Sequence, residues 1–355
     1  MDTPLPRGLS SRSSFRGCLL GGAVGDALGA PVEFRDLAAI RRRHGPAGVT
    51  GLEPAHGRRG AITDDTQLTL FTAEGLIRAH NRWTGRGMVS VEAVVQGSYR
   101  RWLRTQGSGE REPDQDDGWL VGQPALNARR APGATCLAAL QGGERGTRGQ
   151  PLNDSKGCGG VMRIAPVGLV ADEPFELGGK LAALTHGHPT GWLAAAFLAE
   201  LIGMVVRGEG LPEATHLALG RLRRVPGHEE VLRAVERAQA LALEGRPTAA
   251  RVESLGAGWV AEEALAIGVY CALVAQDFRH GVLLAVNHSG DSDSTGSIAG
   301  NLLGLVHGEE AIPAEWRRQL ELADVITTVA DDLWEIRFGK HQDGEGWAVD
   351  RYPGV

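Results

Sequence analysis

The stretch that decides the fold reads NHSGDSDSTGSIAGNLLGLVHG and spans residues 287–308. Its first half is a glycine-bounded turn with two carboxylates and two hydroxyls, those of Asp291, Asp293, Ser294 and Thr295. The small and apolar residues that follow are typical of a buried helix. Like charges this close repel, so such a cluster is spread over solvent, caps the following helix, or is neutralised by a cation. Short turns of this composition are common, and the stretch alone leaves these alternatives open.

An N-terminal segment, FRGCLLGGAVGDALGA at residues 15–30, carries a second stripe of small residues. Its glycines recur every four positions and therefore share one face of a predicted helix: Gly17, Gly21, Gly25 and Gly29. A glycine inside a helix costs about 1 kcal/mol relative to alanine, so the stripe needs a packing reason. The close approach of another backbone would supply one. Pro31 ends the predicted helix.

Helical periodicity dominates the chain, and the period-two alternation of strands is scarce. The further predicted helices span residues 61–80, 90–105, 177–184, 189–206, 213–223, 229–243, 261–276, 281–287 and 294–306. Residues 35–60 are predicted to form an irregular loop, and residues 106–118 an exposed polar one. We therefore expect a compact all-α bundle. Residues 1–13 are predicted to be a flexible tail, and residues 14–355 a single domain.

Composition narrows the class of protein. With 42% hydrophobic and 23% charged residues, the 355-residue chain has the composition of a soluble globular protein with a sizeable core. The net charge of -6 argues against a general nucleic-acid binder that neutralises phosphates. The longest apolar run, residues 192–206, is short for a membrane span and contains Glu200, which indicates a buried helix. We expect no membrane insertion.

The four cysteines, Cys18, Cys136, Cys158 and Cys271, lie far apart in the sequence. They do not show the paired spacings of a zinc site or of a dense disulfide framework. A reduced, cytoplasmic setting is therefore expected.

A second acidic cluster lies near the start of the predicted helix at residues 61–80. Thr63, Asp64, Asp65 and Thr66 repeat the chemistry of the first cluster, adjacent carboxylates flanked by hydroxyls. Taken singly, these are ordinary first-turn residues, with Thr63 as the helix cap. Together, the two clusters offer oxygen donors that could bridge a pair of hard cations, whose charge would offset the repulsion. The lack of paired Cys and His ligands then favours magnesium, manganese or calcium over zinc.

Three further features each allow a structural and a functional interpretation. Glu33 directly precedes Phe34, an apolar setting for a carboxylate that is either simply exposed or functional. The segment SKGCGGVMR, residues 155–163, is a glycine-rich loop whose amides could hold phosphate. It lacks both the P-loop lysine pattern and the dinucleotide glycine pattern. His186 and His188, in LTHGHPTGW, either act as ligands or form local hydrogen bonds.

Taken in order, five motifs resemble the ADP-ribosylglycohydrolase family, which includes the dinitrogenase reductase-activating glycohydrolases and the ADP-ribosylarginine hydrolases. The motifs are GCLLGGAVGDALGAPVEF, TDDT, SKGCGGVMRIAPVGL, LTHGHP and GDSDSTGSIAGNLLG, and the match runs over about residues 15–308. The resemblance implies a single all-α domain, an orthogonal helical bundle with a dinuclear magnesium or manganese centre in a cleft. It also implies an enzyme that removes ADP-ribose from a modified target.

Position by position, the resemblance implies two ligand sets for two Mg²⁺ ions, with Mn²⁺ as the alternative. One set is Thr63, Asp64 and Asp65, and the other is Asp291, Asp293 and Ser294. The loop that lines the substrate would contribute Ser155, Gly157, Cys158, Gly159 and Met162, and His186 would join them. Acid or base catalysis falls to Glu33 or to a metal-bound aspartate such as Asp291. Asp26 also matches, and we expect a structural role for it beside the glycine stripe.

The favoured interpretation is a metal-dependent hydrolase of ADP-ribosylated arginine on protein, because the Ser294 pattern resembles the arginine-linked branch. Its rival within the enzymes is hydrolysis of another linkage: serine-linked ADP-ribose, poly(ADP-ribose), O-acetyl-ADP-ribose or a modified nucleobase. A third alternative is a relative that keeps the fold for binding or structure, as certain crystallins do. Such a relative would be expected to lose the acidic residues. The expected partner is an ADP-ribosylated protein or a small ADP-ribose conjugate, with nucleic acid only as a modified substrate.

Overall fold

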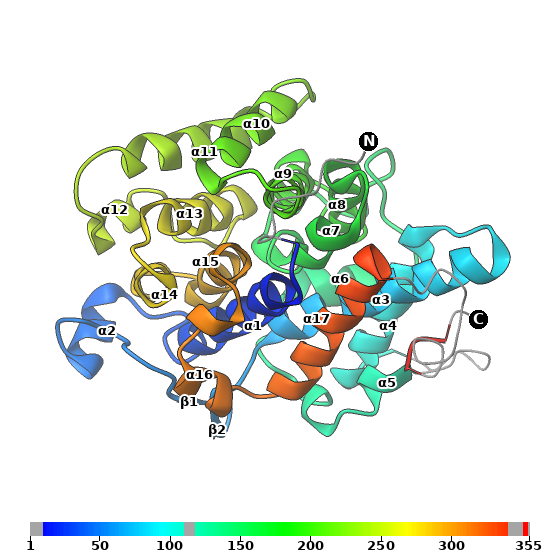
Figure 1. Ribbon diagram of the computed structural model, residues 1–355, viewed down its shortest axis with the longest axis horizontal. Coiled ribbons are helices and arrows are strands. Elements are labelled where there is room, and N and C mark those ends of the chain that lie inside the picture. The colour runs from blue at the N-terminus through cyan, green and yellow to red at the C-terminus, as the bar shows by residue number, and fades with distance from the viewer. Residues whose placement is uncertain (1–9, 110–117, 340–350, 354–355) are drawn as a thin grey trace.

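The computed structural model of the chain describes residues 10–109, 118–339 and 351–353. Within these ranges the protein is built from helices, and its strands form one small hairpin (Figure 1). The α-helices are α1 (Arg12–Gly29), α2 (Leu37–His44), α3 (Asp64–Arg86), α4 (Val91–Thr105), α5 (Gly118–Val121), α6 (Ala134–Gln141), α7 (Ala165–Val170), α8 (Pro174–Ala183), α9 (Pro189–Val206), α10 (Leu211–Leu222), α11 (Glu229–Ala242), α12 (Ala249–Glu253), α13 (Ala261–Val274), α14 (Phe278–Val286), α15 (Ser292–His307), α16 (Ala314–Gln319) and α17 (Ala323–Phe338). Short 3-10 helices are η1 (Pro124–Leu126), η2 (Cys158–Gly160) and η3 (Glu309–Ala311), and the strands are β1 (Pro54–Ala55) and β2 (Arg58–Arg59). The predicted all-α class is confirmed.

Helices α1 and α15 lie side by side at the centre of the molecule (Figure 1). The glycine stripe of α1 faces the small residues of α15, so that backbone packs directly on backbone. A Cβ atom on Gly25 would lie 1.9 Å from the carbonyl oxygen of Gly296, and one on Gly21 would lie 2.3 Å from that of Gly300. Larger residues at these positions would push the helices apart. This contact is the packing reason that the glycine stripe requires.

The neighbouring helices enclose this pair. Helices α13 and α14 pack on α15, whereas α17 packs on α1 and on α3 (Figure 1). Helix α9 is long and apolar enough to cross a membrane by length and composition, but 89% of that stretch is buried inside the molecule. Its one charged residue, Glu200, accepts a hydrogen bond from the Phe175 amide and pairs with Arg221. The prediction of a buried helix is therefore confirmed.

Several helices begin where the sequence predicts, because their capping residues act locally. Thr63 caps α3 by accepting a hydrogen bond from the Asp65 amide, and Ser90 caps α4 in the same way. Helix α1 begins earlier than expected, at Arg12, because the Ser11 hydroxyl caps it. The end of the predicted tail is therefore helical, and residues 1–9 of that tail lie outside the described residues.

The predicted loop at residues 35–60 is wrong in part, because it contains α2 and the β1–β2 hairpin. Asp36 caps α2 by accepting a hydrogen bond from the Ala39 amide. The hairpin turns at His56 and Gly57, whose φ angles of 47° and 84° are left-handed, as a two-residue hairpin turn requires. The strands have two residues each, and α2 buries only Ile40, so neither element shows a recognisable apolar period.

The predicted exposed stretch at residues 106–118 is also wrong at its first residue. Gln106 is buried, and its side-chain amide donates a hydrogen bond to the side-chain oxygen of Gln67 on α3. Residues 110–117 lie outside the described part of the chain. Helices α5, α6, α12, α16 and α17 were not predicted.

Candidate active site

A pocket of about 340 Å³ opens where the ends of α1, α3 and α15 meet the loop before α7. The predicted site residues that line it are Glu33, Asp64, Asp65, Gly157, Cys158, Gly159, Met162, His186, Asp291, Asp293 and Ser294. Thr63 and Ser155 are not among the lining residues. Segments far apart in the sequence therefore converge on one cavity.

The first acidic wall is the first turn of α3. The Asp26 carboxylate, buried on α1, accepts hydrogen bonds from the backbone amides of Thr63 and Thr66 and so fixes the start of this helix. This is the structural role expected for Asp26. Asp64 is held from the other side, because its Oδ2 atom accepts a hydrogen bond of 3.2 Å from the Gly133 amide. Asp65 Oδ1 is buried and has no hydrogen-bond partner among the described residues.

The second acidic wall is the first turn of α15. Asp291 caps this helix by accepting a hydrogen bond from the Ser294 amide. Asp293 Oδ1 accepts from the same amide at 3.1 Å. Thr295 faces away, since its hydroxyl donates to the carbonyl oxygen of Ala285 and lies 2.8 Å from the Nε2 atom of His288. Capping and a place in the pocket are thus compatible for Asp291, whereas Thr295 belongs to the core.

The packing of α1 on α15 brings Glu33 to these two walls. Gly29, at the end of α1, lies so close to α15 that a Cβ atom there would be 2.3 Å from the Asp293 amide nitrogen. The chain then turns, and the Glu33 amide donates a hydrogen bond of 2.9 Å to the Gly29 carbonyl oxygen. As a result, carboxylate oxygens of Glu33, Asp291 and Asp293 lie within 4.8 Å of one another.

Burial and repulsion favour the protonated forms of these acids. Burial, followed by the charges of Asp293 and Asp291, raises the pKa of Glu33 to about 10. Burial and then the Asp293 charge raise the pKa values of Asp64, Asp65 and Asp291 well above the usual range. Within the described ranges, no lysine or arginine lines the pocket to offset this charge. Protons or bound cations must therefore neutralise the cluster.

The donor atoms of the pocket suit a hard divalent cation. Carboxylate and hydroxyl oxygens are the ligands that Mg²⁺ and Mn²⁺ prefer. Asp65 lines the pocket, and its buried Oδ1 atom lacks a hydrogen-bond partner among the described residues. Sulfur atoms, which are soft ligands, also line the pocket in Cys136, Cys158 and Met162, and the Cys158 thiol donates a hydrogen bond of 2.9 Å to Asp291 Oδ2.

The glycine-rich loop forms the opposite wall. Its Cys158 amide donates to the Trp259 carbonyl oxygen at 3.2 Å, and Gly157 pairs with Val260 as an isolated bridge. A Cβ atom on Gly159 would lie 2.9 Å from the His186 ring, so the loop approaches that ring closely. Ser155 supports the loop, because its hydroxyl accepts a hydrogen bond from the Gly157 amide.

The two histidines have different roles. His186 lines the pocket, and its Nδ1 atom lies 2.9 Å from the Thr185 hydroxyl. Burial, followed by the charge of Arg163, lowers the pKa of His186 to about 3, so the ring is neutral at neutral pH. His188 caps α9, where its Nδ1 atom accepts a hydrogen bond from the Thr190 amide. The local hydrogen-bond interpretation therefore holds for His188.

Sequence reasoning missed two parts of the pocket. One is the aromatic pair Phe34 and Trp259, and the other is the segment at residues 131–136. The second carries Gly133, whose amide holds Asp64. The segment at residues 131–136 could have been found from its turn-forming pair, Pro132 and Gly133. The aromatic pair could not, because nothing in the sequence connects Phe34 to Trp259.

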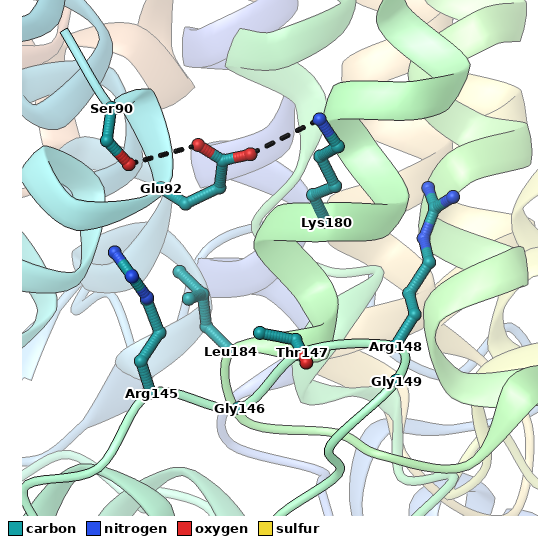
Figure 2. A pocket seen from close by; sticks show the side chains of 9 residues that line it. All are labelled: Ser90, Glu92, Arg145, Gly146, Thr147, Arg148, Gly149, Lys180 and Leu184. Carbon is teal, nitrogen blue, oxygen red and sulfur yellow. Dashed lines mark hydrogen bonds and ion pairs between the residues drawn. The ribbon is translucent and has the colours of Figure 1, made fainter.

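Figure 2 shows a second hollow, of about 390 Å³, that shares no lining residue with the first. Ser90 and Glu92 at the start of α4 face Lys180 of α8 across it. Glu92 accepts a hydrogen bond from the Ser90 hydroxyl and pairs with Lys180 at 3.3 Å. Its carboxylate is thus already neutralised, and none of the predicted site residues lies there.

The chain is similar to known proteins over most of its length. A family model described as ADP-ribosylglycohydrolase matches residues 8–343. The chain is 26% identical to the ADP-ribosyl-[dinitrogen reductase] glycohydrolase of Rhodospirillum rubrum, over 86% of this chain and 90% of that protein. It is 25% identical to the ADP-ribosylhydrolase ARH3 of Bos taurus, over 92% of this chain and 93% of that one.

A further relative and a solved structure extend the likeness. The chain is 24% identical to the ADP-ribosylarginine hydrolase Tri1 of Pseudomonas putida (strain GB-1), over 90% of this chain and 77% of that protein. It is also similar to a solved structure titled "ADP-ribosylglycohydrolase-related protein complex", with a TM-score of 0.68 and 27% identity. That likeness covers 93% of this chain and 100% of the other.

Proposed function

This chain belongs to the ADP-ribosylglycohydrolase family, and we propose that it hydrolyses the glycosidic bond between ADP-ribose and an arginine side chain of a modified protein. The observation that carries the proposal is the convergence of Glu33 and two acidic first turns on one pocket without a lysine or arginine in its described lining. Such a pocket suits a cationic guanidinium group. One similar protein, Tri1, is named as an ADP-ribosylarginine hydrolase.

We further propose that the pocket holds two Mg²⁺ ions, which Mn²⁺ could replace. Thr63, Asp64 and Asp65 would form one ligand set, and Asp291, Asp293 and Ser294 the other. The buried oxygen of Asp65 without a partner and the crowding of the carboxylates support this fit. When bound, the cations would neutralise the cluster, orient the ribose hydroxyls and polarise the attacking water.

Glu33 is our choice for the proton transfer. Cleavage at the anomeric carbon passes through an oxocarbenium-like transition state, and the leaving nitrogen must receive a proton. The Glu33 carboxyl group lines the pocket and forms no hydrogen bond with the described residues, so it is available to a bound substrate. Asp291 accepts hydrogen bonds from the Cys158 thiol and the Ser294 amide, so its carboxylate is held in place. We therefore assign the proton to Glu33 and an orienting role to Asp291.

The loop and His186 would hold the ADP-ribose. Gly157 and Gly159 present backbone to the pocket, as a loop that receives phosphate groups does. The neutral ring of His186 offers one donor or acceptor to a ribose hydroxyl. Cys158 and Met162 would complete this wall, with Ser155 supporting the loop.

One experiment tests the linkage and the metal together. The purified protein is incubated with arginine-linked, serine-linked and nucleobase-linked ADP-ribose, each with Mg²⁺ and with EDTA. We expect ADP-ribose release from the arginine-linked substrate with Mg²⁺, and its loss with EDTA. If ADP-ribose is released only from the serine-linked or the nucleobase-linked substrate, that linkage is the one that the protein hydrolyses, and not the arginine linkage. If ADP-ribose is released from none of the substrates, the protein binds ADP-ribose without hydrolysing the bond. Undiminished release in EDTA would overturn the metal assignment.

Replacing Glu33 with glutamine should lower kcat about 100- to 10,000-fold, because an amide cannot deliver the proton. The proposed metal ligands remain, so Mg²⁺ should still raise the melting temperature of the variant. The control is Glu213→Gln, which changes an exposed glutamate on α10 and should leave kcat unaltered. A kcat for Glu33→Gln close to that of the wild type would remove Glu33 from the mechanism.

A further inference from the structure

Phe34 and Trp259 form an aromatic pair at the mouth of the acidic pocket. Their rings stack with centroids 5.1 Å apart and planes inclined by 21°. Both residues line the pocket, yet 72% of Phe34 and 39% of Trp259 remain exposed. Neither ring takes part in the proposed mechanism. The pair therefore presents aromatic surface that a bound molecule could cover.

The backbone holds both rings at this position. The Trp259 carbonyl oxygen accepts the hydrogen bond from the Cys158 amide, which ties it to the substrate loop. Phe34 directly follows Glu33 and has a φ of 65°, a left-handed conformation that is unfavourable for a bulky residue. Phe34 thus lines the same pocket as Glu33, the residue that precedes it.

The residues that line the pocket indicate which chemical group would bind against the two rings. Glu33, Asp64, Asp65, Asp291 and Asp293 line it, and no lysine or arginine of the described chain does. The described lining therefore has no lysine or arginine side chain that would repel a cationic group. A guanidinium group is planar and delocalised, and it stacks on aromatic faces more readily than other cationic groups. A serine side chain has no such group and gains nothing from the stack.

We propose that the Phe34–Trp259 pair binds the guanidinium group of the target arginine by cation–π stacking and so favours arginine-linked over serine-linked ADP-ribose. This inference rests on the proposed hydrolysis of ADP-ribosylarginine. Because Glu33 directly precedes Phe34 in the chain, a guanidinium group stacked on this pair would place its leaving nitrogen near Glu33. ADP-ribose itself is bound on the other side of the scissile bond, by the loop and His186.

The test compares two probes that each occupy one half of the site. Agmatine carries a guanidinium group without ADP-ribose, and ADP-ribose lacks the guanidinium group. Binding of each to the Mg²⁺-loaded protein is measured by calorimetry, for the wild type and for Phe34→Leu and Trp259→Leu. We expect the Kd of agmatine to rise about tenfold in both variants, while the Kd of ADP-ribose changes less than about twofold.

Two control variants and one kinetic measurement separate an effect on binding from an effect on the structure. Phe34→Tyr keeps the aromatic face and should restore agmatine binding. Trp83→Leu removes an aromatic residue of α3 that is 57% exposed away from the pocket lining, and should change neither Kd. For the arginine-linked substrate, KM should rise in the leucine variants with little change in kcat.

Two results would overturn the inference. If the Kd of ADP-ribose rises as much as that of agmatine, the pair holds ADP-ribose instead. If neither Kd changes in the leucine variants, the pair binds neither molecule. Because calorimetry needs no turnover, a wild-type protein that binds agmatine through this pair but leaves the arginine-linked substrate intact would refute only the proposed function.

Discussion

Replacing Asp293 with alanine is expected to lower kcat by roughly 1,000-fold or more and to abolish the stabilisation by Mg²⁺. Asp293 lies at the centre of the acidic cluster, because its charge helps to raise the pKa values of Asp26, Glu33 and Asp64. The pKa of Asp26 reaches about 7. Removing this carboxylate takes away a proposed ligand and also relieves the repulsion. In EDTA, the variant should therefore melt at a higher temperature than the wild type.

Two measurements check this pair of opposite effects: kcat with Mg²⁺, and the melting temperature with Mg²⁺ and with EDTA. Asp172→Ala serves as the control, since its side chain is 90% exposed and its ion pair with Arg337 lies on the surface. That variant should match the wild type in both measurements. Wild-type kcat in Asp293→Ala would rule out the dinuclear centre, and a lower melting temperature in EDTA would show that Asp293 has a structural role instead.

Replacing Gly300 with alanine should lower the free energy of unfolding by about 3 kcal/mol. A Cβ atom at Gly300 would lie 2.0 Å from the carbonyl oxygen of Gly21, so helices α1 and α15 would have to separate. Backbone atoms cannot rotate away as a flexible side chain can. Because α15 also carries Asp291 and Asp293, the separation should reduce activity along with stability. Chemical denaturation and hydrolysis of the arginine-linked substrate measure the two effects.

The matched control is Gly220→Ala, in the last turns of α10. Apart from the neighbouring helix backbone, no atom of the described residues lies within 4 Å of a Cβ atom built on Gly220, so alanine fits there without a clash. Its higher helix propensity should raise the free energy of unfolding by about 0.5–1 kcal/mol. The two glycine substitutions are thus expected to have opposite signs. A Gly300→Ala variant as stable as Gly220→Ala would show that the close packing of α1 on α15 does not stabilise the fold.

Much of the helical architecture could be predicted, because the signals for a helix are local. Thr63 and Ser90 mark the starts of α3 and α4, since a cap bonds to amides only two or three positions away. Helix α9 was delimited by Pro189 and by its long apolar run, which only Glu200 interrupts. The hairpin escaped because its strands have two residues each, and α2 escaped because it buries only Ile40 and so has no apolar stripe.

The candidate site was predicted only in part, because it depends on contacts between distant segments. Phe34 and Trp259 are far apart in the chain and meet through the fold alone. The Gly133 amide reaches Asp64 from 69 positions further along the chain, and no local pattern indicates that bond. Periodicity describes the face of one helix, whereas such contacts depend on how two helices are placed.

The sequence by itself determined that two helices begin with crowded carboxylates and that one glycine stripe needs a close neighbour. Only the tertiary structure showed that the neighbour is α15, and that its packing on α1 brings Glu33 to Asp291 and Asp293. It also separated Ser294, which lines the pocket, from Thr295, which bonds within the core. Adjacent residues on a helix point about 100° apart, and the placement of the helix decides which of them meets the cavity.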